Sequence, residues 1–246
     1  MWRLDDVVVK LYAKSHDNPL FANDPGRERA ALTALAGTGM VPHPLTFGAF
    51  DGCDWLAYRH IPGITWTSGA GHVAQLLGRL HDQPVIEDLP SGASGSHALE
   101  IQTRAILDRC RDPQDLQHSE PPGHVRPHDQ ATLIHGDPVP GNILAHDGTL
   151  TLIDWQCPQI GDPVEDLALF LSPAMQQVYR GAPLSAEEEV AFLAGYPDPR
   201  LVKRYHQLRP WYHWRMAAYC RWRDERDGAG ESHAYLLERT ALDQCR

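Results

Sequence analysis

The first sixty residues alternate between short apolar runs and turn-forming residues, which is the pattern of β-strands. An apolar run over residues 7–12 predicts a buried strand after a turn at Asp5-Asp6. Two further runs, residues 41–50 and 55–59, flank an Asp-Gly pair at positions 51 and 52, which favours a hairpin turn. Lys10 lies inside the first run. Because burying an unpaired ammonium is costly, Lys10 should face a polar cleft or an anion.

A helix is predicted between these strands, where Asp24 can cap its first turn and Pro25 can occupy its first position. The apolar spacing continues to a stop at Gly37. Glu28, one turn into this helix, is the natural counter-ion of Lys10. The alternative is that Lys10 extends to solvent and Glu28 is a surface charge.

Beyond residue 62 the apolar positions follow the period of helices. Val73, Leu76, Leu77 and Leu80 recur at spacings of three and four, which predicts an amphipathic helix ending near His81, a packing or capping residue. Apolar spacing and capping signals predict further helices over residues 99–110, from 162, over 185–195, from 198 and over 211–223. Residues 113–130, rich in Pro, His, Asp and Gln, are predicted to form a loop.

Residues 135–155 hold the most informative polar pattern. Asp137, Asn142 and Asp154 alternate with two short apolar runs, and those runs flank Asp147-Gly148. The Asp-Gly pair predicts a two-stranded hairpin with Asn142 and Asp154 side by side at its open end. A carboxylate that accepts a hydroxyl proton, with an amide and a second carboxylate that hold magnesium, is the minimal set for moving a phosphoryl group to an alcohol.

Three blocks in this region resemble signatures of the aminoglycoside phosphotransferase and choline kinase-like family. They are His-Gly-Asp at 135–137 with Asn142 five residues after its Asp, Ile-Asp-Trp at 153–155, and Gly-Asp-Pro-Val-Glu-Asp-Leu-Ala at 161–168. Protein kinases share the five-residue spacing but carry His-Arg-Asp, Asp-Phe-Gly and Ala-Pro-Glu instead. A protein kinase is therefore the weaker interpretation.

The resemblance implies an α+β, protein-kinase-like two-lobed fold, with a small N-terminal lobe at residues 1–62 and a mainly helical C-terminal lobe at 63–246. It implies ATP and Mg²⁺ as cofactors and a small-molecule hydroxyl, such as that of an aminoglycoside or a choline-like metabolite, as acceptor. The catalytic residue would be Asp137, and the metal ligands would be Asn142 and Asp154. The nucleotide would be bound by Lys10 braced by Glu28, and by a hinge made of Arg59, His60 and Ile61. Asp166 would either brace the catalytic loop or serve only the dipole of its helix.

Kinase-like small lobes begin with two strands and a loop that covers the nucleotide phosphates. Here only Met1–Leu4 precede the turn at Asp5-Asp6, so we expect a truncated N-terminal β lobe in which Trp2–Leu4 ends the second strand. Either the start is set too late or the protein lacks this cover. The alternative function is then a catalytically impaired kinase-like binding or regulatory protein. An exposed sheet edge would also favour a homodimer.

Composition narrows the class of partner. The formal net charge is -10, which disfavours nucleic acid, and no apolar run approaches the roughly 18 residues of a membrane span. Five cysteines without C-x-x-C spacing and no signal peptide favour the cytoplasm. The acidic composition favours a cationic acceptor. The tryptophans at 211, 214 and 222 could supply its binding face, although burial in the core is the simpler interpretation.

Overall fold

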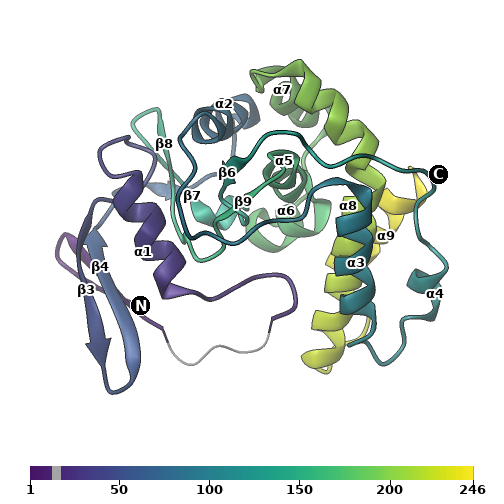
Figure 1. The fold of residues 1–246 in the computed structure, drawn as a ribbon, viewed down its shortest axis with the longest axis horizontal. Coiled ribbons are helices and arrows are strands. Elements are labelled where there is room, and N and C mark those ends of the chain that lie inside the picture. Colours follow the sequence, from purple (N-terminus) through teal and green to yellow (C-terminus); the bar gives the residue numbers. More distant parts are fainter. Residues whose placement is uncertain (13–17, 246) are drawn as a thin grey trace.

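The computed structural model describes residues 1–12 and 18–245, and it contains a small antiparallel sheet beside a larger helical part (Figure 1). The sheet has the strand order β1-β2-β4-β3. Its strands are β1 (Trp2–Leu4), β2 (Val7–Leu11), β3 (Pro44–Phe50) and β4 (Cys53–Arg59). The predicted strands are present, but β3 begins at Pro44 rather than residue 41, and β4 begins at Cys53 rather than residue 55. Proline is compatible with the first position of a strand.

Helix α1 (Pro25–Ala34) packs against β3 and β4. Its predicted start is confirmed, because the Asp24 carboxylate accepts hydrogen bonds from the backbone N–H groups of Gly26 and Arg27 at 2.8 and 3.1 Å. Such a cap satisfies two N–H groups that have no partner inside the helix. The cap fixes the direction of α1 and therefore the place of Glu28 on its first turn.

Three short strand pairs and one 3-10 turn complete the strand structure outside the four-stranded sheet, within the residues described. Strand β5 (Ile64–Thr65) pairs with β7 (Ile143–His146), which pairs with β8 (Thr149–Leu152). Strand β6 (Thr132–Ile134) pairs with β9 (Gln159–Gly161), and a 3-10 turn, η1 (Pro140–Asn142), precedes β7. In Figure 1 the β7–β8 hairpin lies between the four-stranded sheet and the helices.

The helical part gathers around one long helix, α8, which contacts α3, α5 and α9. Its helices are α2 (Ala70–His81), α3 (Gly95–Leu107), α4 (Gln114–Gln117), α5 (Val164–Leu171), α6 (Pro173–Arg180), α7 (Ala186–Gly195), α8 (Pro199–Arg226) and α9 (His233–Asp243). The predicted capping box of α7 is confirmed at Ser185 and Glu188. The helices predicted from 198 and over 211–223 are one helix that continues through Pro210. None of these helices is long and apolar enough to cross a membrane, within the residues described.

Two predicted boundaries were wrong. Helix α3 begins at Gly95, four residues before the predicted start, and α4 lies inside residues 113–130, which were predicted to be a loop. The reason for α4 is tertiary, because Leu116 is fully buried and its carbonyl accepts a hydrogen bond from the Trp214 indole at 2.7 Å. A four-residue helix fixed by a distant partner leaves little periodic signal of its own.

The aromatic segment of α8 lies in the core. Trp211, Trp214 and Trp222 are each less than a tenth exposed, which agrees with the simpler interpretation. Arg215 of the same segment also lies in the core. Its guanidinium is buried and pairs with Glu165 of α5, and a buried charge of this kind requires such a partner.

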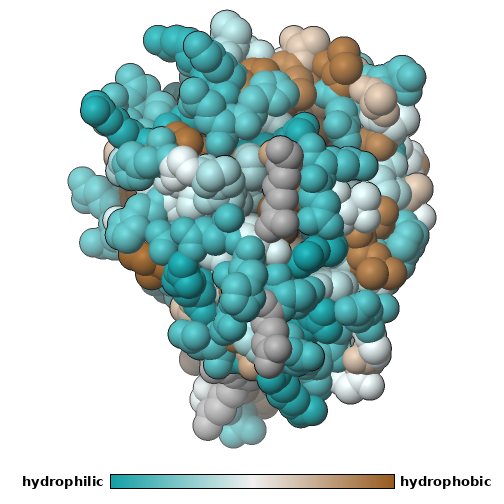
Figure 2. Space-filling view, turned by 90° about the vertical axis from the view of Figure 1, so that its right-hand side faces the viewer, coloured by the Kyte–Doolittle hydropathy of each residue, from teal (hydrophilic) through white to brown (hydrophobic). Residues whose placement is uncertain are grey.

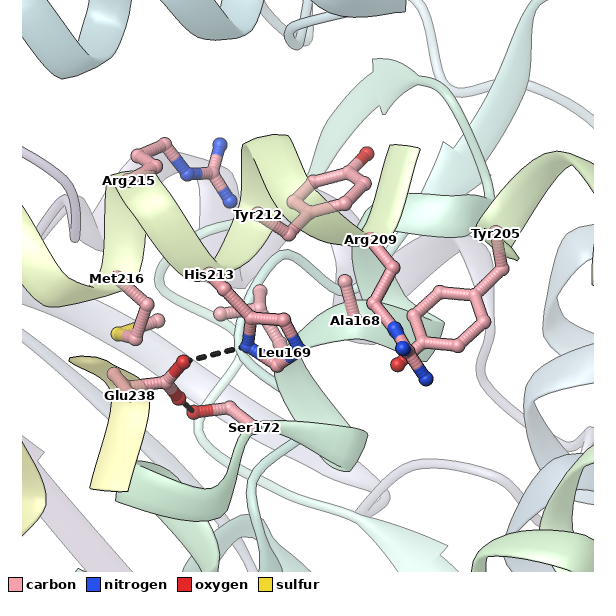
Figure 3. Close-up of a pocket in the computed structure, with 10 residues that line it drawn as sticks. All are labelled: Ala168, Leu169, Ser172, Tyr205, Arg209, Tyr212, His213, Arg215, Met216 and Glu238. Carbon is pink, nitrogen blue, oxygen red and sulfur yellow. Dashed lines mark hydrogen bonds and ion pairs between the residues drawn. The ribbon is translucent and has the colours of Figure 1, made fainter. Parts of the chain in front are cut away.

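The buried carboxylate of Glu238 links helix α9 to α8 and to the start of α6. Figure 3 shows Glu238 between His213 of α8 and Ser172, the residue that caps α6. His213 Nδ1 lies 2.7 Å from Glu238, the Ser172 hydroxyl donates to it, and the backbone N–H of Ala174 donates at 3.2 Å. On the face in Figure 2, hydrophilic side chains cover most of the surface and hydrophobic ones form small separate groups. The C-terminal helices are therefore held mainly by their buried sides.

Candidate active site

The hairpin predicted from Asp147-Gly148 is present. Strands β7 and β8 pair in register from His146–Thr149 to Ile143–Leu152, and Asp147 and Gly148 have φ of 45° and 75°, as a tight hairpin turn requires. At the open end the Ile153 N–H donates to the Asn142 carbonyl at 2.9 Å. The hairpin thus brings the backbones next to Asn142 and Asp154 together.

Asp137 and Asn142 are joined directly across η1. The Asn142 amide nitrogen donates to the Asp137 carbonyl at 2.9 Å and to its carboxylate Oδ2 at 3.0 Å. This contact fixes the carboxylate and directs the amide oxygen of Asn142 to another ligand. Burial raises the pKa of Asp137 well above its usual value, and the negative charge of Asp154 raises it further. A carboxylate in this environment accepts a proton more readily than one in water.

His135 supports the backbone of this loop. It is fully buried, and burial lowers the pKa of its imidazole. The neutral ring fits one tautomer, in which Nε2–H donates to the Ile153 carbonyl at 3.1 Å and Nδ1 accepts the Asp137 N–H at 3.2 Å. His135 therefore ties the Asp137 loop to the strand that leads into Asp154.

Asp166 braces the same loop from α5. Its buried carboxylate accepts the N–H groups of His135 and Gly136, each at 2.8 Å. Of the two interpretations left open by the sequence, bracing is therefore the one the structure supports. Asp166 is also bonded at 3.0 Å to His81 Nε2, and His81 Nδ1 lies 2.7 Å from the Tyr196 hydroxyl. His81 is packed inside the protein, as predicted, and its contact with Asp166 adds a positioning role that the sequence did not indicate.

We expect His81→Ala to lower kcat about tenfold, the equivalent of about 1.4 kcal/mol in the barrier, by loosening Asp166. The affinity for ATP should change little. Steady-state kinetics against ATP and acceptor would separate the two effects. Tyr196→Phe, which removes only the outer hydroxyl, is the matched control and should have a smaller effect. An equal loss in kcat and in ATP affinity would point to general unfolding instead.

Gly136 has a conformation and a position that exclude a side chain. Its φ is 75°, and a Cβ built there would lie 2.1 Å from the Cys157 carbonyl oxygen. An arginine, as in the protein-kinase loop, could not occupy this position without moving the backbone. The glycine in His-Gly-Asp is therefore required by the close passage of residues 136 and 157.

Lys10 and Glu28 form the predicted ion pair. Lys10 on β2 is buried, and its Nζ lies 2.7 Å from Glu28 Oε2. The Tyr12 hydroxyl donates to the same carboxylate oxygen at 2.5 Å. Lys10 also donates a hydrogen bond to Asp154. The structure therefore brings Lys10, Glu28 and Asp154 together, although 144 residues separate the first from the last.

The predicted hinge residues lie at the end of β4. The backbone N–H of Arg59 donates to the His43 carbonyl at 2.9 Å, and that of His60 donates to the Asp6 carbonyl at 2.7 Å. The Arg59 side chain is more than half exposed and pairs with Asp6. Two of the three backbone donors in the predicted hinge are thus already used within the small sheet.

Asp137 and Asp154 line the same cavity. It has a volume of about 220 Å³, and its lining includes Asp137, Asp154, Gln156, Cys157, Asn18 and Arg226. Burial raises the pKa of the Cys157 thiol, and the sulfur donates to the Ala22 carbonyl. Such a thiol stays protonated and is a poor nucleophile. The carboxylates are therefore the reactive groups of this cavity.

The donor set fits magnesium that arrives with a polyphosphate. Mg²⁺ is usually held by one or two carboxylates together with substrate phosphates. Asp154 offers a partly exposed carboxylate, and Asn142 offers an amide oxygen. Among the residues described, no group of three or more His, Cys, Asp or Glu is placed to hold a metal. The further oxygen ligands would have to come from nucleotide and water.

The suggestion that the tryptophans of α8 form a face that binds a cation is wrong. Trp214 is fully buried and its indole N–H is used by Leu116. Trp222 already has two guanidinium groups over its ring, those of Arg226 at 4.9 Å and Arg109 at 5.4 Å. A cationic acceptor would find these tryptophan faces covered.

The model of the phosphotransferase enzyme family matches residues 2–211. No curated protein sequence matches the chain. A choline/ethanolamine kinase family protein from Mesorhizobium loti is 14% identical, with a TM-score of 0.64 over 99% of this chain and 82% of that one. Choline kinase LicA from Streptococcus pneumoniae is 16% identical, with a TM-score of 0.63 over 98% and 86%. Spectinomycin phosphotransferase APH(9)-Ia, in complex with ADP and spectinomycin, is 16% identical, with a TM-score of 0.57 over 98% and 82%. These likenesses confirm the predicted α+β, protein-kinase-like fold.

Proposed function

Because this chain belongs to the phosphotransferase enzyme family, we propose that it transfers the γ-phosphate of ATP to a hydroxyl group of a small molecule with the help of Mg²⁺. The observation that carries the proposal is that Asp137 and Asp154 line one cavity, while Asn142 donates a hydrogen bond to Asp137 and Lys10 donates one to Asp154. A base, an amide, a metal-binding carboxylate and a cation are the parts that phosphoryl transfer requires.

In the proposed reaction the acceptor oxygen forms a bond to the γ-phosphorus. The bond from that phosphorus to the β,γ-bridging oxygen breaks, and ADP leaves with the electron pair. Asp137 takes the hydroxyl proton, for which its raised pKa suits it. Asn142 holds one oxygen of that carboxylate by its N–H and leaves the other for the acceptor.

Lys10 and the metal would neutralise the phosphates. In the structure Lys10 is shared between Glu28 and Asp154. When nucleotide binds, a phosphate oxygen can take the place of Asp154 on Lys10, which frees Asp154 for Mg²⁺. Glu28 and Tyr12 would keep Lys10 in position during this exchange. Asn142 and Asp154 would hold the ion, which would supply positive charge to the phosphates.

The adenine would bind at the hinge of Arg59, His60 and Ile61. Since the N–H groups of Arg59 and His60 are used, we assign the donor role to Ile61. The two lobes would be residues 1–62 and 63–246. This division is supported by β5, the first strand after residue 62, which pairs with the catalytic hairpin rather than with the four-stranded sheet.

We expect Asp154→Asn to weaken magnesium-dependent nucleotide binding by at least the roughly 10- to 100-fold that loss of a supporting partner costs a metal site. Asparagine suits this position because Asp154 has φ of 63°, a region that Asn tolerates and Ala does not. Calorimetry of ATP binding with and without Mg²⁺ measures the effect. Asp147→Asn, on the exposed turn of the same hairpin, is the control. Unchanged metal dependence would leave Asp154 with a structural role only.

The test of the function is a screen of small hydroxyl compounds with Mg²⁺-ATP, in which ADP release and the phosphorylated product are measured together. Equal amounts of both would establish transfer. Nucleotide binding without transfer to any acceptor would instead favour the kinase-like binding or regulatory protein.

A cytoplasmic location agrees with five free thiols. A homodimer would use β1, an edge strand with exposed Trp2 and Leu4.

A further inference from the structure

The cavity that holds Asp137 is also lined by Arg226, from the last turn of α8. Residues 219, 223 and 226 are spaced four and three apart and therefore share one face of that helix. Tyr219 fixes the direction of this face, because its hydroxyl accepts a hydrogen bond at 3.1 Å from Asn18, another residue of the cavity wall. Phe21, also of the wall, packs edge-on against the Tyr219 ring. The C-terminal turn of α8 thus places Arg226 at the catalytic cavity, with Arg223 on the same face of the helix.

The carboxylates of the cavity and the Arg223 charge both influence the pKa of the same two tyrosines. Burial and the carboxylates of Asp137 and Asp154 together raise the pKa of Tyr179 to about 12, while the Arg223 charge acts in the opposite direction. Tyr219 is influenced by Asp137 and Arg223 in the same opposed way. Tyr179 and Tyr219 are therefore near both the reacting carboxylates and the cationic end of α8.

The surroundings of Arg226 leave it able to bind an anion. Its ion-pair partner is Asp227, the next residue in the chain, and both side chains are about half exposed. The guanidinium also lies over the Trp222 ring, 4.9 Å from the ring centroid. Exposed ion pairs of this kind contribute little and exchange easily. The pair uses Nε and one terminal nitrogen, whereas a guanidinium has five N–H donors. A carboxylate in the cavity could be shared with, or replace, Asp227.

The remaining polar wall is uncharged. Asn23 and Gln156 line the cavity with amide groups, and so does Asn18, whose amide already bonds to Tyr219 and to the backbone N–H groups of Leu20 and Phe21. Amides match hydroxyl groups, which both donate and accept. The two carboxylates of the wall are engaged by the proposed reaction, one as base and one as metal ligand.

We propose that the acceptor is a polyhydroxylated carboxylate, whose anionic group binds Arg226 with support from Arg223 while one of its hydroxyls reaches Asp137. Arg226 then determines specificity, and the net charge of the chain does not. This inference rests on the proposed function for the identity of the cavity as acceptor site. It reverses the cationic acceptor expected from composition.

Gluconate, sorbitol and glucamine test the proposal, because they share a chain of hydroxyls and end in a carboxylate, a hydroxymethyl and an aminomethyl group. Binding of each to the protein with Mg²⁺ and a non-hydrolysable ATP analogue is measured by calorimetry. Gluconate should bind at least tenfold more tightly than glucamine, with sorbitol between them. Glucamine binding as tightly as gluconate, or no binding by any of the three, would overturn the inference. Preferential binding of gluconate without its phosphorylation would contradict the proposed function alone.

The variant Arg226→Gln should reduce the preference for gluconate over sorbitol about tenfold and leave affinity for the ATP analogue unchanged. Arg223→Gln should have a smaller effect in the same direction. Arg200→Gln is the matched control, since Arg200 also pairs with an aspartate but lies at the opposite end of α8. If Arg226→Gln weakened the nucleotide and spared gluconate, Arg226 would be a phosphate-binding residue and the assignment would be wrong.

Discussion

Asp137→Asn is expected to lower turnover by about two to four orders of magnitude, the loss typical when a general base is removed. An amide cannot take the acceptor proton, whereas its shape preserves the contact with Asn142. The nucleotide contacts proposed for Lys10 and Asp154 do not involve Asp137. Affinity for ATP should therefore stay nearly normal while kcat falls, and calorimetry with steady-state kinetics would separate the two.

Asp147→Asn is the control for this variant. It makes the same chemical change on the same hairpin, but the Asp147 side chain is 90% exposed on the turn. Its φ of 45° is one that asparagine also tolerates. Turnover of the control should equal that of the parent protein. If Asp137→Asn also kept near-normal turnover, another group would have to accept the proton.

The part of the site that sequence could predict is the part fixed by short-range geometry. Asp137, Asn142 and Asp154 lie within 18 residues, and an Asp-Gly turn sets the register of the hairpin that carries the last two. Lys10 and Glu28 are farther apart, yet a lysine in a buried strand requires an anion, and the capped helix places one nearby. The rule about turns was sufficient for the hairpin, whereas the rules about caps and buried charge left a solvent-exposed Lys10 as the alternative, which the buried ion pair excludes.

The positioning residues depend on which helices become neighbours. His81 and Asp166 are 85 residues apart, and no local pattern specifies that α2 and α5 pack side by side. The sequence therefore left two roles open for Asp166 and gave His81 none in catalysis. A polar residue at the buried end of an amphipathic helix was the available signal.

The prediction of a cation-binding face made of tryptophans was wrong for a related reason. An arginine- and tryptophan-rich helix has the same composition whether its aromatic side lies in the core or lines a pocket. Net charge is a sum over the whole surface, so -10 says little about the few groups that line one cavity. Only the fold shows that Trp214 lies in the core and that Arg226 lines the cavity with Asp137.

Gly136→Ala is expected to reduce turnover by about a hundredfold or more, the scale of loss when a reacting group moves by about 1 Å. The new Cβ would lie 2.1 Å from the Cys157 carbonyl oxygen, so the loop must move to relieve the clash. That movement would disturb the bonds from His135 and Gly136 to Asp166 and shift Asp137. The left-handed φ adds about 1–2 kcal/mol for any residue with a Cβ. Kinetics and thermal unfolding together would measure both parts.

The variant Gly148→Ala separates the effect of backbone strain from the effect of the steric clash with Cys157. Gly148 has the same φ of 75°, but a Cβ built there meets nothing within 4 Å. This control should lose the stability due to the left-handed backbone and keep its turnover. Equal loss of turnover in both variants would mean that backbone strain in the hairpin, and not the close passage of Gly136 and Cys157, limits the catalytic loop. A larger loss of turnover in Gly136→Ala would mean that the His-Gly-Asp block needs its glycine because the backbone passes close to Cys157.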